Sequence, residues 1–317
     1  MRKRPLIVLS TVAAATLLLA GCAGSAEPES SGTPDAAASE CMLDAQPGET
    51  SDSVVVEGEG VDAKVTIPAD AAFAGVERTV ISEGEGDQVL VNDLVSVEYQ
   101  IVDATSNEVL DSSARGDDGL LPVLLDTNQS SLFVAALECE PVGSRVALAL
   151  PADVLGEGAS NVVVYAEAVE QLPLVASGDA VEPTPGMPTV ELADDGAPTI
   201  TIPDGDAPTE TEVAVLKQGD GATVASGDLV VVQYMGVKWS DGEEFDSSWS
   251  REAVPSQFQT TGVVAGFQKA LEGQQVGSQV IVVMPPAEGY GASEGHELQN
   301  ESLVFVVDIL ATTPVQQ

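Results

Sequence analysis

Two stretches of this 317-residue chain repeat each other at a spacing of 135 residues. Residues 65–68 read Val-Thr-Ile-Pro, and residues 200–203 read Ile-Thr-Ile-Pro. Further along, the spacing becomes 134, because Val-Gly-Ser at 142–144 returns at 276–278. A period this long is typical of two copies of one domain, since solenoid repeats are much shorter. The sequence therefore predicts two domains of the same fold.

The N-terminal residues 1–21 have the pattern of a secretory signal peptide. Residues 2–4 are basic, residues 6–19 form an apolar run that is short for a membrane span, and Leu-Ala-Gly-Cys stands at 19–22. This last motif matches a bacterial lipobox and predicts cleavage before Cys22 and lipidation of that cysteine. An ordinary secretory signal that happens to contain a cysteine is the alternative. The predicted location is extracytoplasmic, with a lipid anchor in the bacterial cell membrane.

Two further segments have the composition of flexible connections. Residues 22–40, rich in Ala, Ser, Gly, Pro and acidic side chains, are predicted to be a lipidated tether, and residues 173–195 a linker. The first domain is then expected over 41–172 and the second over 196–317.

The chain keeps two cysteines besides Cys22, namely Cys41 and Cys139. Export places them in an oxidising compartment, where paired cysteines usually form a disulfide, so a bond between them is predicted. Two free, buried cysteines are the alternative. With a single histidine in the chain, the usual zinc ligand sets are out of reach, and no metal site is expected.

Local patterns in the second copy predict antiparallel strands and one short helix. Residues 230–235 and 303–310 are rich in β-branched and apolar side chains, which favour strands. Asp-Gly at 241–242 is typical of a tight hairpin turn. Apolar residues within 267–271 have helical spacing, and Gly273 is placed to end that helix. Each domain is thus expected to be α+β, an antiparallel β-sheet with a short helix.

Composition excludes several classes of function. The chain carries 51 acidic and 11 basic residues, a net charge of −40, so nucleic acid is not an expected partner. His296 lies in a polar loop and is predicted to be a surface residue. No phosphate-binding glycine loop and no G-x-S-x-G motif occurs, which argues against nucleotide-dependent and hydrolytic enzymes. No cofactor is expected.

Aromatic side chains make up only 4% of the chain, yet six of the ten Phe and Tyr residues fall in the second copy between residues 234 and 305. These six are Tyr234, Phe245, Phe258, Phe267, Tyr290 and Phe305. Taken singly, each is as well explained as part of a small hydrophobic core. Their motifs, in chain order, are Tyr-Met-Gly at 234–236, Asp-Gly-Glu-Glu-Phe-Asp-Ser-Ser at 241–248, Val-Val-Ala-Gly-Phe at 263–267, Val-Gly-Ser at 276–278, Gly-Tyr-Gly-Ala at 289–292 and Leu-Val-Phe at 303–305.

In this order and spacing, over about 100 residues, the motifs resemble the signatures of FKBP-type peptidyl-prolyl cis/trans isomerases. The resemblance implies an antiparallel sheet wrapped on a short helix, and proline-containing unfolded or exported polypeptides as substrates. Tacrolimus-like macrolides are possible further ligands. It also implies a proline pocket lined by Tyr234, Phe245, Asp246, Val263, Val264, Phe267, Tyr290 and Phe305.

By the same resemblance, Phe267 forms the pocket floor, and the Val264 amide and the Tyr290 hydroxyl hold substrate carbonyls. Two departures bear on substrate preference and macrolide affinity. Ser256 stands where the family commonly has an aromatic residue, and residues 294–301 replace a longer, less polar flap.

The first copy keeps the expected scaffold but not the pocket. Tyr99, Asp111 and Phe133 match Tyr234, Asp246 and Phe267. The other matched positions hold Leu110, Gln129, Ser130 and Val164, and no tyrosine lies near Gly156. The sequence predicts an FKBP-like first domain without isomerase activity and a foldase acting on X-Pro bonds in the second. The alternative is a non-catalytic FKBP-like binding or chaperone module on the cell surface.

Overall fold

The computed structural model describes residues 45–116 and 119–315, all within one compact unit, Glu40–Gln317. The predicted signal peptide, the lipidation site Cys22, the tether 22–40 and Cys41 lie outside the described residues. Below, the first half means residues 45–172 and the second half residues 173–315. Within the described ranges, none of the helices is long and apolar enough to cross a membrane.

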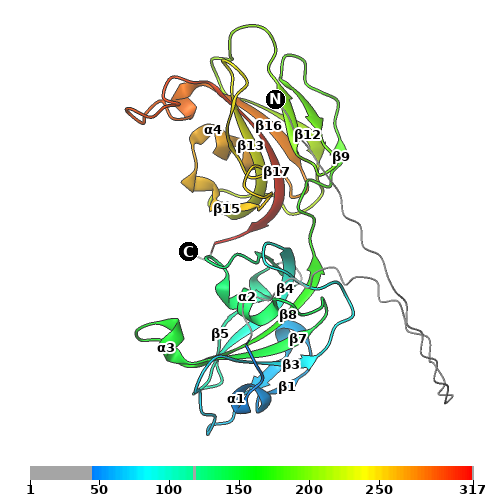
Figure 1. Cartoon of the computed structure of the whole chain (residues 1–317), viewed down its shortest axis with the longest axis vertical. Coiled ribbons are helices and arrows are strands. Elements are labelled where there is room, and N and C mark those ends of the chain that lie inside the picture. The colour runs from blue at the N-terminus through cyan, green and yellow to red at the C-terminus, as the bar shows by residue number, and fades with distance from the viewer. Residues whose placement is uncertain (1–44, 117–118, 316–317) are drawn as a thin grey trace, which may run out of the picture. The chain divides into compact units, whose positions relative to one another are not determined.

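The first half is built on one antiparallel sheet (Figure 1). Its strands are β3 (Glu77–Ser82), β4 (Leu94–Asp103), β5 (Val109–Ser112), β6 (Leu121–Leu124), β7 (Arg145–Leu150) and β8 (Val162–Gln171). They are ordered β3-β7-β8-β4-β5, and β6 also pairs with β4. The two central ten-residue strands, β4 and β8, are buried over most of their length, and both contain several valines, which favour strands.

The second half repeats this sheet strand by strand. Its strands are β12 (Glu212–Gln218), β13 (Leu229–Lys238), β14 (Glu244–Ser247), β15 (Ser256–Gln259), β16 (Gln279–Met284) and β17 (Leu303–Thr313). The order β14-β13-β17-β16-β12 matches that of the first sheet read from β5, and β15 pairs with β13 as β6 does with β4. The structure is therefore mostly β-sheet, with few short helices.

A short hairpin precedes each sheet. In the first half β1 (Val55–Glu57) pairs with β2 (Lys64–Thr66), and in the second β10 (Thr189–Leu192) pairs with β11 (Pro198–Thr201). The predicted boundary at residue 196 falls between the two strands of the second hairpin. The repeating unit thus begins earlier than the sequence motif at 200–203 suggested.

One helix packs on each sheet at the same place in the repeat, α2 (Ser131–Leu137) in the first half and α4 (Ala265–Leu271) in the second (Figure 1). Helix α4 matches the predicted helix, and Gly273 just beyond it has φ +85°. The first half differs from the expectation of a single helix, because one-turn helices α1 (Glu49–Asp52) and α3 (Ala152–Leu155) are also present. Short 3₁₀ turns include η1 (Gly60–Asp62), η2 (Ser113–Arg115), η4 (Thr260–Gly262) and η5 (Pro286–Glu288).

The segment predicted to be a linker, 173–195, is partly fastened to the second sheet. Strand β9 (Asp179–Ala180) pairs with β12 and extends that sheet by one strand. The Ala176 N–H donates to the carboxylate of buried Asp308 at 2.8 Å, and the Lys217 ammonium donates to the Ala176 carbonyl at 3.0 Å. Proline, glycine and acidic residues suggested a free connection, but backbone hydrogen bonds anchor it irrespective of composition.

Each half has its own hydrophobic core between helix and sheet. In the first half α2 contributes Val134 and Leu137, and in the second α4 contributes Phe267, Ala270 and Leu271. The second core is the one into which the predicted pocket residues pack.

Candidate functional site

The predicted pocket residues of the second half lie around one aromatic ring, that of Phe267. Helix α4 places this side chain over the sheet, where it is 5% exposed. Its ring meets those of Tyr234, Phe258 and Phe305 edge to face, with centroid distances of 5.8, 5.6 and 5.0 Å. Edge-to-face packing of this kind stabilises each pair by roughly 0.5–1.5 kcal/mol beyond burial. Phe267 is therefore held rigidly as the base of the site.

Strands β14 and β17 add a second edge-to-face pair. Phe245 on β14 and Phe305 on β17 have ring centroids 5.3 Å apart. Gly236 on β13 lies beneath both rings, and a Cβ there would come within 2.6 Å of Phe305 and 2.7 Å of Phe245. The glycine of the Tyr-Met-Gly motif is thus needed so that the two aromatic side chains can approach the backbone.

A polar network borders this aromatic cluster. The Tyr234 hydroxyl donates to Asp246 Oδ2 at 2.6 Å, and Arg251 donates to the Tyr234 hydroxyl at 2.9 Å and to Asp246 Oδ1. The Arg251 guanidinium also lies 5.5 Å from the Tyr234 ring centroid. Burial and then the Asp246 hydrogen bond raise the pKa of Tyr234, against the opposing effect of Arg251. The tyrosine therefore stays protonated at neutral pH.

Val263 and Val264 form the entry to α4. Val264 is the residue before the helix, with extended φ and ψ of −62° and 148°, and its carbonyl accepts from Phe267 and Gln268. Both valine side chains pack partly buried against the second core. In the part of the chain that the structure describes, the Val264 N–H has no hydrogen-bond acceptor. It is available to a ligand carbonyl.

Tyr290 closes the site from the segment after η5. Its ring is half-buried and stacks flat on His296, with centroids 4.2 Å apart and an angle of 4°. Burial and the nearby Asp246 carboxylate raise the pKa of Tyr290. His296 is exposed, as predicted, but its stacking on a site residue was not predicted. The polar flap is pinned by Leu298, which is buried in the core.

The structure thus brings together all eight predicted pocket residues, and it adds Arg251, Phe258, His296 and Leu298. Phe258 was noticed as an aromatic residue but was not assigned to the site. Arg251 had one detectable signal, because the first copy also has an arginine, Arg115, shortly after its matching aspartate. Arg251 follows Asp246 by one residue more than Arg115 follows Asp111, so a comparison of the two copies at a fixed spacing does not align the two arginines.

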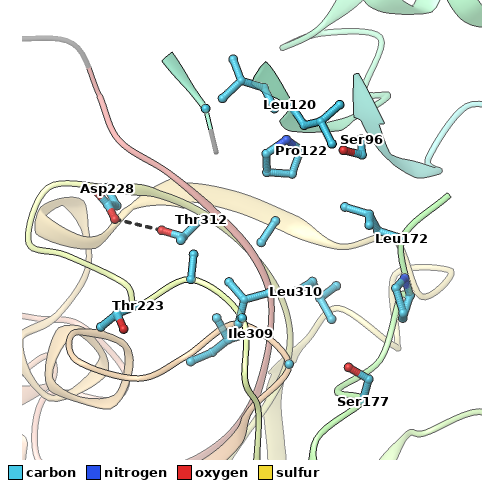
Figure 2. A pocket seen from close by; sticks show the side chains of 18 of the residues that line it. Ser96, Leu120, Pro122, Leu172, Ser177, Thr223, Asp228, Ile309, Leu310 and Thr312 are labelled. Atoms are coloured by element: carbon cyan, nitrogen blue, oxygen red, sulfur yellow. Dashed lines mark hydrogen bonds between the residues drawn. The ribbon is translucent and has the colours of Figure 1, made fainter. Parts of the chain in front are cut away.

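A cavity of about 550 Å³ lies elsewhere in the chain, and Figure 2 shows the side chains that line it. Its lining includes Ser96, Leu172, Leu310 and Thr312, and none of the eight predicted pocket residues. The Thr312 hydroxyl donates to Asp228 there at 3.0 Å. Across residues 45–116 and 119–315, no cluster of His, Cys, Asp and Glu side chains is arranged to hold a metal ion.

Of the two cysteines predicted to form a disulfide, only Cys139 lies within the described residues. Cys139 takes part in a disulfide bond, and its predicted partner Cys41 lies outside the described residues.

Comparison with known proteins identifies the second half. Residues 221–310 match the family model of FKBP-type peptidyl-prolyl cis-trans isomerase. The chain is 42% identical over 94 residues to a probable FK506-binding protein of Corynebacterium glutamicum, covering 29% of this chain and 79% of that protein. The chain belongs to the FKBP-type peptidyl-prolyl cis-trans isomerase family. The enzyme class predicted from the motifs is confirmed, and the matched residues contain the whole Phe267 cluster.

Further proteins are similar to this chain. FK506-binding protein 1 of Debaryomyces hansenii is 35% identical over 107 residues, covering 32% of this chain and 92% of that protein. The FKBP-type 22 kDa peptidyl-prolyl cis-trans isomerase of Escherichia coli is 40% identical over 98 residues, covering 30% and 47%. Among solved structures, FkpA from Escherichia coli aligns with a TM-score of 0.32 and 28% identity, over 42% of this chain and 54% of that one.

Proposed function

We propose that the second half isomerises X-Pro bonds of exported polypeptides in the pocket based on Phe267. The arrangement that supports this is the buried aromatic base beside two free donors. These are the unpaired Val264 amide and the Tyr290 hydroxyl, which has no hydrogen-bond partner within the described residues. In this proposal the chain has two FKBP-like domains, and the second carries the activity.

The pocket suits the physical chemistry of prolyl isomerisation. The barrier of about 20 kcal/mol comes from the loss of amide resonance, so the twisted transition state is less polar than the planar amide. An apolar wall of Phe267, Phe305 and Phe245 favours the twisted state over the ground state. The Val264 amide and the Tyr290 hydroxyl hold carbonyls flanking the rotating bond, which fixes the peptide while it turns. No nucleophile and no cofactor takes part.

The Tyr234–Asp246–Arg251 network has a positioning role in this mechanism. The Tyr234 ring touches Phe267 and Phe305, so anchoring its hydroxyl fixes the wall of the pocket. The Asp246 carboxylate is half-exposed and is neutralised by Arg251, with side-chain exposures of 41% and 49%. A paired carboxylate can face the proline amide without repelling its carbonyl oxygens.

A protease-coupled proline isomerisation assay on the chain without residues 1–21 tests the proposal. We expect Phe267→Ala combined with Tyr290→Phe to lower kcat/KM on the order of 100-fold, since one lost transition-state hydrogen bond alone can cost that much. Unchanged activity in the double variant would reject this site.

Tyr165→Phe is a matched control for the tyrosine change. The Tyr165 hydroxyl is buried in the first half and has no hydrogen-bond partner among the described residues, so its removal should leave kcat/KM unaltered. An equal loss in this control would show that the assay reports general destabilisation.

Lipid anchoring at Cys22 is the second part of the proposal. The basic start, apolar run and lipobox of residues 1–22 support it. Expressed in a bacterium, the chain should sediment with membranes, and Cys22→Ser should release it into the soluble extracytoplasmic fraction. A Cys22→Ser chain that still sediments would contradict the anchor.

Binding of tacrolimus-like macrolides should be weak in this chain. Ser256 on β15 replaces an aromatic wall residue, and its hydroxyl lies 3.4 Å from Arg251, which makes this side of the pocket polar. We expect Ser256→Phe to tighten macrolide binding severalfold, because it restores apolar contact area. Titration followed by the fluorescence of Trp239 and Trp249 measures it.

A further inference from the structure

The first half keeps the polar network of the pocket although it lacks most of the pocket's walls. The Tyr99 hydroxyl donates to Asp111 Oδ2 at 2.8 Å, Arg115 donates to Asp111 Oδ1, and its guanidinium lies 5.7 Å from the Tyr99 ring centroid. The Phe133 ring meets Tyr99 edge to face at 4.9 Å. Tyr234, Asp246, Arg251 and Phe267 of the second half have the same arrangement.

An open cavity of about 360 Å³ lies over this network. Tyr99, Asp111, Arg115 and Phe133 line it, together with the exposed side chain of Gln129. Leu229, Gln257 and Thr313 of the second half complete the lining. This volume falls within the range of small-molecule and peptide sites. The Arg115 side chain is 30% exposed, and its Nη1 donates to Asp111 and to the Ser112 carbonyl. Because a guanidinium carries five N–H donors, Arg115 can also donate to a ligand carbonyl.

The same site lacks the groups that would favour a twisted amide. Leu110 takes the place of Phe245 and is 57% exposed, so it forms no wall, and Val164 takes the place of Phe305. Gln129 and Ser130 replace the valines before the helix, and α3 has no tyrosine to match Tyr290. A site that binds the planar prolyl amide and the twisted transition state with equal affinity does not accelerate isomerisation.

We propose that the first half is a second, non-catalytic binding site for a proline-containing segment of the client polypeptide. The pyrrolidine ring lies on Phe133, and Arg115 donates to a neighbouring backbone carbonyl. The class of ligand rests on the proposed function of the second half. Two sites on one chain raise the local concentration of any client with two prolines, so one segment is held while the other isomerises.

Isotope-labelled NMR on the chain without residues 1–21 tests this, with the tetrapeptide Ala-Leu-Pro-Phe as the probe. We expect saturable shifts of backbone amides in both halves, near Phe133 and near Phe267. Shifts confined to the second half overturn the proposal. So does equal binding of Ala-Leu-Ala-Phe to the first half, since it would remove proline from the recognition.

Two variants separate the sites. Phe133→Ala should abolish the first-half shifts, whereas Phe267→Ala should abolish those of the second half together with isomerase activity. Since Phe133→Ala can also perturb folding, Arg115→Gln provides a milder change that leaves the core intact. It should weaken first-half binding about tenfold through the lost charged hydrogen bond. Unaltered first-half affinity in Arg115→Gln contradicts the binding mode.

The control is Val80→Ala on β3, an exposed side chain that does not line the cavity, and it should leave both sets of shifts as in the parent chain. The experiments distinguish failure of the proposed isomerase activity in the second half from failure of the proposed binding site in the first half. Absent isomerase activity with persistent first-half shifts rejects only the catalytic role, and activity without first-half shifts rejects only the second site.

Discussion

The two halves of this chain share a scaffold and differ at the pocket. Both have the same strand order, the same helix on the sheet, and the same tyrosine–aspartate–arginine network. They differ where Phe245, Val263, Val264, Tyr290 and Phe305 line only the second site. Because the network persists where the walls are lost, it is part of how the fold joins β4 to β5 and β13 to β14. The walls and free donors, not the network, therefore distinguish the two sites.

A second comparison lies across the centre of each sheet. In the second half Asp308 on β17 stands opposite Gln233 and Gln279, and it is capped by the Ala176 N–H. The matching row of the first half is charged, with Glu167 on β8 opposite Glu98 and Arg145. One sheet thus places neutral amides beside its central carboxylate, whereas the other places a second carboxylate and an arginine there.

Reduction of the disulfide should produce the largest difference between the halves. The bond of Cys139, if closed with Cys41, removes entropy from an unfolded loop of about 100 residues and stabilises the first half by about 4–5 kcal/mol. Hydrogen exchange followed by mass spectrometry should show faster exchange of first-half amides in dithiothreitol, with the cysteine-free second half unchanged. A Cys41→Ser/Cys139→Ser chain is the control, since its hydrogen exchange should be the same with and without dithiothreitol. Equally faster exchange in both halves would contradict the prediction that the disulfide stabilises only the first half.

Truncation of the matched phenylalanines should give an intermediate difference. Phe267 is 5% exposed and meets three aromatic rings, so Phe267→Ala should lower the free energy of unfolding of the second half by about 3–5 kcal/mol. Phe133 is half-buried and its ring contacts one other ring, so Phe133→Ala should lower the free energy of unfolding of the first half by roughly 2 kcal/mol. Hydrogen exchange resolves the two halves, and equal losses would show that the two aromatic bases are equivalent.

The smallest effect concerns pH. Burial raises the pKa of Asp308 above its ordinary value of 3.8, so the folded state keeps a proton that the unfolded state has lost. Between 3.8 and the folded pKa, the free energy of unfolding should therefore fall as pH rises, and above that window it should stay level. Urea unfolding of Asp308→Asn should lack this slope.

Glu167→Gln is the matched change in the first half, because burial also raises the pKa of Glu167. It should flatten the acid slope of the first half alone. If Asp308→Asn keeps the full slope of the parent chain, another group is responsible.

Local chemistry was enough to predict many elements of the second half. The β-branched run at 230–235 lies within β13, and the Asp-Gly turn at 241–242 joins β13 to β14, with Gly242 at φ +72°. The helix spacing at 267–271 lies within α4. These features succeed because strand propensity, turn conformation and helix periodicity are decided by neighbouring residues.

The elements that were missed depend on contacts between distant residues. Strand β9 is held by pairing with β12, and Ala176 just before it donates to Asp308, which is far away in the chain, so the composition of this segment did not predict the strand. The stacking of His296 on Tyr290 and the contacts of Arg251 with Tyr234 likewise depend on how loops return to the sheet.

The sequence by itself determined the internal repeat and the family of the second copy, and it was enough to propose eight residues for the pocket, because repeats and motif spacing survive as linear patterns. Only the tertiary structure decided that these residues meet around Phe267, that Arg251 neutralises Asp246, and that the first copy retains a cavity. Strand register is the physical reason, since pairing of β13 with β14 and β17 brings side chains from distant segments onto one face of the sheet.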